Sequence, residues 1–157
     1  YVPALDLVKP LSANDKKSSF VGSDFAYEDV SGRHWSEDSH KFLREEEKDG
    51  YKAWVIESAP KSDDYFEKKL TWIDQESKLI VREEYTNSKG ELLKVLEVMK
   101  IVTVDGHPTA SERRMTTPRK NNNTSIVFSE IGYDQGISAD IFAERYLKSP
   151  PRQYIGN

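Results

Sequence analysis

The sequence contains no cysteine among its 157 residues. This absence excludes disulfide bonds, thiolate metal sites and a cysteine nucleophile, although it does not fix the cellular compartment. Long apolar runs are also missing, since none approaches the roughly 20 residues that a membrane-spanning helix needs. The chain opens on Tyr1 without a methionine or a signal sequence, so we interpret it as a mature fragment or as a piece of something longer.

A strong net charge is missing as well. The formal net charge is −4 at pH 7 and the two signs are mixed along the chain, which argues against a nucleic-acid groove. Apolar residues make up 36% of the chain and charged residues 32%, so we expect a hydrated protein with a thin or partly open core. We predict one domain over residues 1–148, followed by a tail over residues 149–157.

Strand-forming residues recur between turn signals along most of the chain. Asp-Gly pairs at 49–50 and 105–106 are strong hairpin signals. Residues 91–104 also carry a helical stripe of apolar residues, but four valines, one isoleucine and the turn that follows favour a strand. A further strand is expected over residues 5–11, where Pro10 limits it to an edge of the sheet or to the end of a strand. The other expected strands cover residues 41–48, 51–59, 65–73, 78–86, 107–117 and 124–133.

One short helix is expected after these strands, over residues 138–147, with Ser138 as its N-cap. Sequential strands joined by hairpins form a meander, and a meander of this length tends to curl. The predicted fold is therefore mainly β: a curled antiparallel sheet or incomplete barrel of about seven or eight strands, with a short C-terminal helix.

Residues 19–33 form a dense loop that interrupts this pattern. The loop is too irregular for a strand and too rich in Gly and Ser for a helix, so we predict a lid, a binding loop or a plug. Its carboxylates could serve acid–base chemistry or a hard cation, but the spacing lacks the pattern of a calcium loop. We favour the interpretation that the acids hold turns while the aromatic residues anchor the loop to the sheet. The candidate lid residues are Gly22, Ser23, Asp24, Phe25, Tyr27, Glu28 and Asp29.

Other catalytic or metal-binding patterns find little support. His34 and His40 flank two acids and could in principle hold a metal, but no further ligand pattern accompanies them. The sequence contains no nucleophile elbow and no glycine-rich phosphate loop. We therefore predict no enzyme activity, no metal and no cofactor.

Apolar residues of the expected strands could line a ligand cavity or simply fill a core. The two interpretations merge in a single curled sheet, because its concave face is core if filled and pocket if empty. Both stay open at this point. The candidate ligand-binding residues are Trp54, Ile56, Leu70, Trp72 and Ile80.

The sequence also resembles a known family. The segments YVPAL at residues 1–5 and FVGSDF at 20–25, followed by Tyr-Glu-Asp and Ser-Gly-Arg, are similar to the outer-membrane lipoprotein-sorting protein family. Later features agree, among them a Lys-Gly turn before a long strand and Asp-Ile-Phe at 140–142 before Arg-Tyr-Leu at 145–147. Members of this family are similar in fold to the periplasmic lipoprotein carriers LolA and LolB.

This resemblance implies a periplasmic protein, made with a signal peptide, whose incomplete barrel encloses an apolar cavity for acyl chains. The expected function is a non-catalytic carrier of lipid or lipoprotein. The alternative is an accessory module of an envelope export complex that binds protein and carries no lipid. The resemblance implies an inner-membrane exporter as a partner, and we expect no nucleic acid among the partners. The family has a helix and several strands before the position that matches Tyr1, so the sheet edge left exposed here could pair with a second chain as a dimer.

Overall fold

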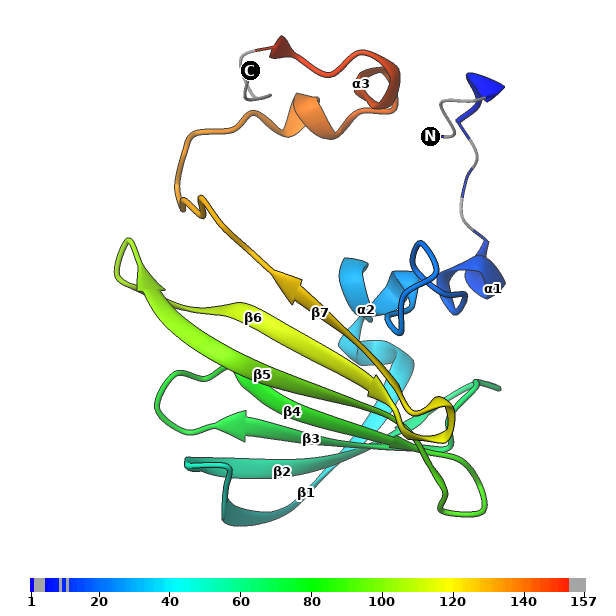
Figure 1. Ribbon diagram of the computed structural model, residues 1–157, viewed down its shortest axis with the longest axis vertical. Coiled ribbons are helices and arrows are strands. Elements are labelled where there is room, and N and C mark those ends of the chain that lie inside the picture. The colour runs from blue at the N-terminus through cyan, green and yellow to red at the C-terminus, as the bar shows by residue number, and fades with distance from the viewer. Residues whose placement is uncertain (2–4, 9, 11, 153–157) are drawn as a thin grey trace.

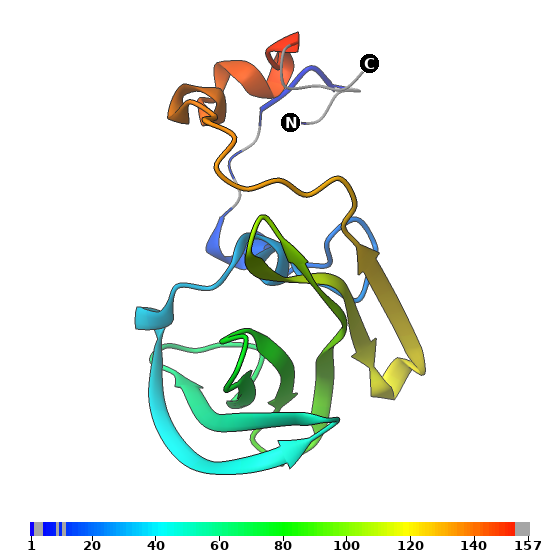
Figure 2. The ribbon, with the colours of Figure 1, turned by 90° about the vertical axis from the view of Figure 1, so that its left-hand side faces the viewer.

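A computed structural model describes residues 1, 5–8, 10 and 12–152. Within these residues, seven antiparallel strands form one sheet in sequence order, and Figures 1 and 2 show that this sheet curls without closing. The predicted curled meander is therefore confirmed. The strands are β1 (Asp38–Lys48), β2 (Tyr51–Pro60), β3 (Lys68–Asp74), β4 (Ile80–Thr86), β5 (Leu92–Val104), β6 (His107–Thr117) and β7 (Asn122–Val127).

Two of the hairpins are set by their turn residues. Asp49 and Gly50 join β1 to β2 with φ angles of 53° and 84°, and Asp105 and Gly106 join β5 to β6 with φ angles of 49° and 83°. Positive φ at both central residues is what the tight turn of a two-residue hairpin requires, and Asp-Gly tolerates it well. The predicted turns and the strand assignment of residues 91–104 are thereby confirmed.

Some predicted boundaries are wrong. β3 begins at Lys68 instead of residue 65, because Tyr65 and Phe66 leave the sheet to pack against Tyr85 of β4, at ring-centroid distances of 6.2 and 5.2 Å. β7 ends at Val127, and the chain then turns away from the sheet. Residues 9 and 11 of the strand expected over 5–11 lie outside the described residues, and its described part forms no strand.

The predicted C-terminal helix is also shorter than expected. Ser138 does cap it, accepting a hydrogen bond from the amide of Asp140 at 3.3 Å. The extended backbone of Ala143, with a ψ angle of 147°, then divides the segment into a 3₁₀ turn, η4 (Ala139–Phe142), and a single α-turn, α3 (Arg145–Lys148). Figure 1 shows this segment apart from the sheet, so its apolar stripe has no sheet surface on which to extend a helix.

Register defines two faces of the sheet. We call the face that carries Val55 and its partner Trp72 the core face. Here Ala53, Val55, Trp72 and Val81 form the buried cluster, and Leu43, Tyr51, Leu70 and Ile101 pack against it. The carboxylate of Glu46 on β1 also accepts a hydrogen bond from Trp72 Nε1, and this bond lowers the pKa of Glu46.

The opposite side is the cover face. Across it, the register aligns Ile56, Thr71, Glu83, Leu96 and Met115 on five successive strands. Met115 is fully buried although it lies on the opposite face from Val55. The sheet is therefore buried on both sides, and the second burial has to come from residues outside the strands.

Candidate binding cavity and its cover

The cover is the loop predicted to be a lid. Residues 19–33, hereafter the cover segment, lie against the cover face after the short helix α1 (Ala13–Lys16). The loop is more regular than expected, because it contains the one-turn helix α2 (Tyr27–Ser31). Phe25 is only 2% exposed, and the ring of Phe20 meets that of Tyr27 edge-on at 5.3 Å. Aromatic residues thus anchor the segment.

Acids of the cover segment bind the sheet directly. Asp24 accepts hydrogen bonds from the hydroxyls of Thr117 on β6 and Thr124 on β7, at 2.7 and 2.8 Å. Asp29 accepts one from the amide of Ala26 at 2.7 Å and pairs with Lys94 Nζ of β5 at 2.8 Å. Holding a turn was the expected role of these acids, and Asp29 does so, but both acids also fasten the segment to the strands.

Arg33 closes the segment with a second set of ion pairs. Its guanidinium donates three hydrogen bonds to Asp38, at 2.8, 3.0 and 3.2 Å, and lies 3.2 Å from Glu28 and 2.9 Å from Asp64. Burial opposes its charge, but these acids outweigh burial and raise the pKa of Arg33. Burial also raises the pKa of Glu28, although Arg33 acts in the opposite direction.

Aromatic and charged side chains of the cover face complete the contact between the sheet and the cover segment. Lys94 Nζ lies 4.7 and 4.3 Å from the ring centroids of Tyr65 and Tyr85, within the range of cation–π attraction. The Tyr85 hydroxyl donates to Glu83 at 2.9 Å, and Lys69 Nζ pairs with Glu83 at 3.2 Å. Burial raises the pKa of both tyrosines, so their hydroxyls stay protonated near neutral pH.

A cavity of about 440 Å³ lies between the cover segment and the cover face. Its volume falls within the range of small-molecule sites. Leu79, Ile80, Leu96, Val98 and Ala110 supply its apolar lining. The charged side chains that line it are Glu28, Asp29, Arg33, Lys69, Lys78, Glu83 and Arg113. An apolar floor with a charged margin suits an amphiphilic ligand.

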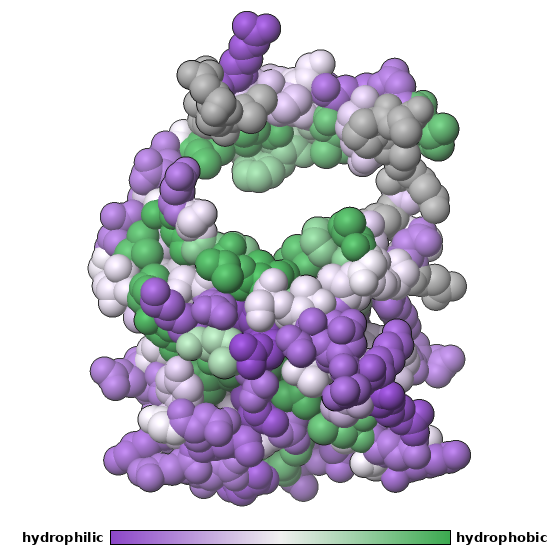
Figure 3. Space-filling view, in the orientation of Figure 1, coloured by the Kyte–Doolittle hydropathy of each residue, from purple (hydrophilic) through white to green (hydrophobic). Residues whose placement is uncertain are grey.

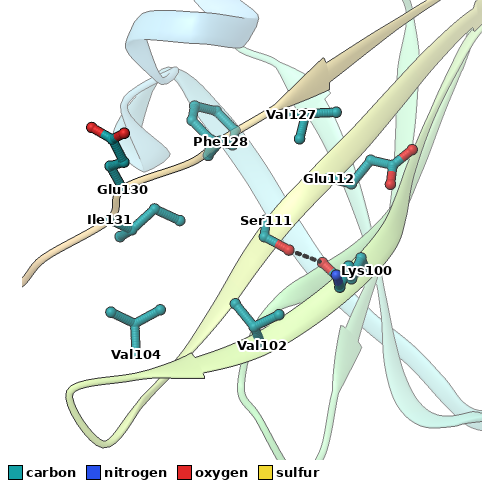
Figure 4. Close-up of a pocket in the computed structure, with 9 residues that line it drawn as sticks. All are labelled: Lys100, Val102, Val104, Ser111, Glu112, Val127, Phe128, Glu130 and Ile131. Atoms are coloured by element: carbon teal, nitrogen blue, oxygen red, sulfur yellow. Dashed lines mark hydrogen bonds between the residues drawn. The ribbon is translucent and has the colours of Figure 1, made fainter.

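A second hollow of about 280 Å³ opens beside β5 and β6, toward the turn that joins these two strands (Figure 4). Val102, Val104, Val127, Phe128 and Ile131 give it an apolar lining, and Lys100, Glu112 and Glu130 lie at its margin. Figure 3 shows apolar surface on both sides of the opening between the C-terminal segment and the sheet. This hollow is smaller than the cavity under the cover.

The predicted ligand-binding residues do not share one face. Trp54 pairs with Ile73, so Trp54 and Ile56 lie on the cover face, while Leu70 and Trp72 lie on the core face. Ile80, opposite Ile73, lines the cavity. The predicted alternation of faces within each strand was correct. Which residues of neighbouring strands share a face, however, depends on the register between those strands. The expectation of one shared concave face is therefore corrected, and a role in ligand binding stays a prediction.

Sequence reasoning did not single out Ala110 and Arg113 of β6 as cavity residues. Their strand was predicted, but nothing in its polar composition points to a cavity. Leu96 and Val98 were recognisable as one side of a long strand, and the register places both over the cavity. Period-two alternation was thus the only available signal.

The histidines that could have held a metal have other partners. His40 Nδ1 lies 2.8 Å from the Ser58 hydroxyl and its Nε2 lies 2.7 Å from the carbonyl oxygen of Trp35. His34 Nδ1 lies 2.7 Å from the hydroxyl of Ser36. Within residues 1, 5–8, 10 and 12–152, no group of three His, Cys, Asp or Glu side chains is placed to bind a metal ion.

Among the described residues, no helix combines the length and the apolar character that crossing a lipid bilayer requires.

The open curled sheet and its cover define a LolA-like fold. A "putative outer membrane lipoprotein-sorting protein domain" from Vibrio parahaemolyticus has a TM-score of 0.85 at 29% identity over 94% of this chain. A DUF1329 family protein from Desulfovibrio piger scores 0.83 at 29% identity over 94% of this chain. A LolA superfamily protein from Nitrosomonas europaea scores 0.68 at 19% identity over 93%, and this third likeness shows the fold alone. The resemblance seen in the sequence is confirmed.

The chain belongs to a family whose sequence model, described as "Uncharacterized protein", matches residues 1–149. No curated protein matches it. The chain spans 64%, 62% and 66% of the lengths of the Vibrio, Desulfovibrio and Nitrosomonas structures, which is less than two thirds of each.

Proposed function

We propose that the protein is a non-catalytic periplasmic carrier that holds an acyl chain of a lipid or lipoprotein in the cavity beneath the cover segment. The observation that carries this proposal is the apolar floor of that cavity, closed on one side by a segment that ion pairs hold in place. Likeness to a domain described as lipoprotein-sorting supports the same function and compartment.

Transfer of the acyl chain from water to this floor would drive binding, at roughly 0.8 kcal/mol per buried methylene. The cover segment would act as the gate, because it lies over one side of the cavity and is held there by the Asp29–Lys94 ion pair and by buried Phe25. Ile80 would contact the ligand, and Trp54 and Ile56 would extend the same face outside the cavity. Leu70 and Trp72 would act only through the stability of the core face.

The carrier function can be tested by filling part of the cavity with a larger side chain. The Ala110→Leu variant adds bulk to the cavity lining, and the Ala59→Leu variant, whose residue lies outside the lining, is the matched control. Purified wild-type protein is extracted and analysed by mass spectrometry for bound lipid, and displacement of a neutral fluorescent dye by hexadecanol is measured for all three proteins. We expect weaker displacement for Ala110→Leu alone, at unchanged thermal stability. Equal displacement by all three would contradict the use of this cavity.

A second candidate function rests on a separate observation. Phe142 and Leu147 of the C-terminal segment are 82% and 51% exposed, which is unusual for large apolar side chains gathered on one segment. This exposure favours the alternative of an accessory module that binds an envelope exporter or a second copy of the chain. Replacing both residues with Ser should abolish co-purification of such a partner while hexadecanol binding stays unchanged. Loss of hexadecanol binding with retained co-purification would argue against this function.

A further inference from the structure

The charged side chains around the cavity differ in whether they pair with a side chain of opposite charge. Three carboxylates and four cations line it. Each carboxylate has a cationic partner: Glu28 pairs with Arg33, Asp29 with Lys94 and Glu83 with Lys69, at 3.2, 2.8 and 3.2 Å. The acidic side of the lining is therefore already neutralised by the protein.

Among the described residues, two cations of the lining, Lys78 and Arg113, form no salt bridge with a carboxylate, although the charge of Lys78 helps to lower the pKa of Asp74. Lys78 is exposed on the β3–β4 turn, where its ammonium donates to the carbonyl of Gln75 and lies 4.6 Å from the Trp54 ring centroid. Arg113 is half-buried on β6, and its guanidinium carbon lies 5.6 Å from the ring centroid of Phe128. Arg113 is therefore a half-buried cation of the cavity lining whose charge no carboxylate balances with a salt bridge.

Register places Arg113 beside the apolar floor. It pairs with Val98 on β5, which also lines the cavity, and with Ile126 on β7. Leu96 lies two residues from Val98 on the same face. An apolar tail on Leu96 and Val98 would therefore end within reach of the guanidinium. A planar guanidinium binds carboxylate and phosphate groups through paired hydrogen bonds, which a lysine ammonium cannot do.

We propose that the cavity selects amphiphiles with an anionic head, and that Arg113 is the residue that binds that head. This inference rests on the proposed carrier function, and it adds the chemical class of the ligand. The head is a carboxylate, as in a free fatty acid, or a phosphate monoester or diester, as in a phospholipid. Neutral lipids of equal chain length would bind through the floor alone.

The experiment compares three probes of equal chain length: hexadecanol, hexadecanoate and hexadecyl phosphate. Each displaces the neutral dye N-phenyl-1-naphthylamine from the wild-type protein and from the Arg113→Gln, Arg113→Lys and Arg119→Gln variants. Arg119 is exposed on the turn after β6 and lies outside the cavity lining, so it is the matched control. Comparison of the two anionic probes tells a carboxylate from a phosphate head.

The wild type and the Arg119→Gln variant should bind at least one anionic probe roughly tenfold or more tightly than hexadecanol, as a charge-assisted hydrogen bond would give. Arg113→Gln should lose that preference and keep its affinity for hexadecanol, and Arg113→Lys should keep part of the preference. The preference should also shrink as salt is raised, a measurement on the wild type that needs no variant.

Two results overturn the inference, and they differ in what else they overturn. If all probes bind equally to the wild type, or if Arg113→Gln keeps the preference, the head-group assignment is wrong and the carrier function stands. If no probe displaces the dye from the wild type, the carrier function fails together with this inference.

Discussion

Lys94 of β5 and Asp29 of α2 form an ion pair with an Nζ–Oδ distance of 2.8 Å, and their side chains are only 9% and 6% exposed. The two residues are far apart in sequence, so this pair fixes the cover segment to the sheet from inside the structure. A buried pair of this kind contributes little relative to a well-packed apolar replacement, but removing one partner leaves a costly unpaired charge.

Replacing only Lys94 with Met should therefore destabilise the protein by about 3 kcal/mol, because Asp29 would stay buried without its counter-charge. The double variant Asp29→Asn, Lys94→Met should recover much of that loss. Urea denaturation measures the free energy of unfolding, and hydrogen exchange of the Gly32 amide, which donates to the backbone carbonyl of Glu28 at 2.9 Å, reports the cover segment itself. A double variant as unstable as the single variant would contradict this account.

Replacement of Phe25 tests the aromatic anchor. Phe25→Ala should cost about 3–5 kcal/mol of stability, as is typical of a buried phenylalanine, and Phe25→Asp should cost more. Either variant should also release bound dye faster, because the cover is loosened. Phe142→Ala is the control, since that side chain is 82% exposed and its removal should change stability by less than about 0.5 kcal/mol. Unchanged stability and dye retention in Phe25→Asp would exclude the anchoring role.

Arg33→Gln should lower stability at pH 8 by about 3–5 kcal/mol, because Glu28, Asp38 and Asp64 would lose their shared counter-charge. The pKa of Glu28 is already raised by burial, and loss of Arg33 raises it further. A carboxyl with a raised pKa in the folded state costs stability above that pKa, and the cost disappears as the pH falls through it. The deficit of the variant should therefore shrink between pH 8 and pH 5 in thermal unfolding. A deficit that grows over this range would contradict the assigned pairing.

Asp74 should show the opposite dependence on pH. Burial would raise its pKa, but hydrogen bonds from the hydroxyl and amide of Ser77, at 2.6 and 2.7 Å, outweigh burial and hold the pKa below its ordinary value. The stability that these bonds supply is present above the unfolded-state pKa and is lost as the pH falls through the lower, folded-state value. Asp74→Asn should thus cost about 1–2 kcal/mol at pH 7 and progressively less below pH 4. A cost that is independent of pH would show that the charge of Asp74 does not matter.

Much of the sheet was predictable because its signals are local. Alternation and Asp-Gly turns are properties of a few consecutive residues, and they located β5 and β6 almost to the residue. The C-terminal helix was overestimated, because residues 138–147 have helical spacing but no sheet surface to pack against. Propensity without tertiary packing supports only a turn or two.

The cavity was less predictable because it depends on register between strands. Irregular pairing at Trp72 and Ile73 of β3 shifts β4 by one residue, and no sequence pattern announces that shift. Pairs such as Asp24 with Thr124 join distant parts of the chain, so neither partner carries a local sign of the other. The composition of the cover segment predicted a lid, a binding loop or a plug anchored by aromatic residues, but only the fold shows that its acids bind the sheet.

The positions of the tryptophans give the protein a set of natural optical reporters. Trp72 is 3% exposed on the core face, Trp54 is half-buried on the cover face, and Trp35 is 72% exposed before β1. Their indole rings lie in surroundings of three different polarities. The wavelength of their fluorescence emission and their access to a soluble quencher should therefore distinguish the three residues. Variants that keep a single tryptophan would then distinguish a change on the cover face, which Trp54 reports, from melting of the core, which Trp72 reports.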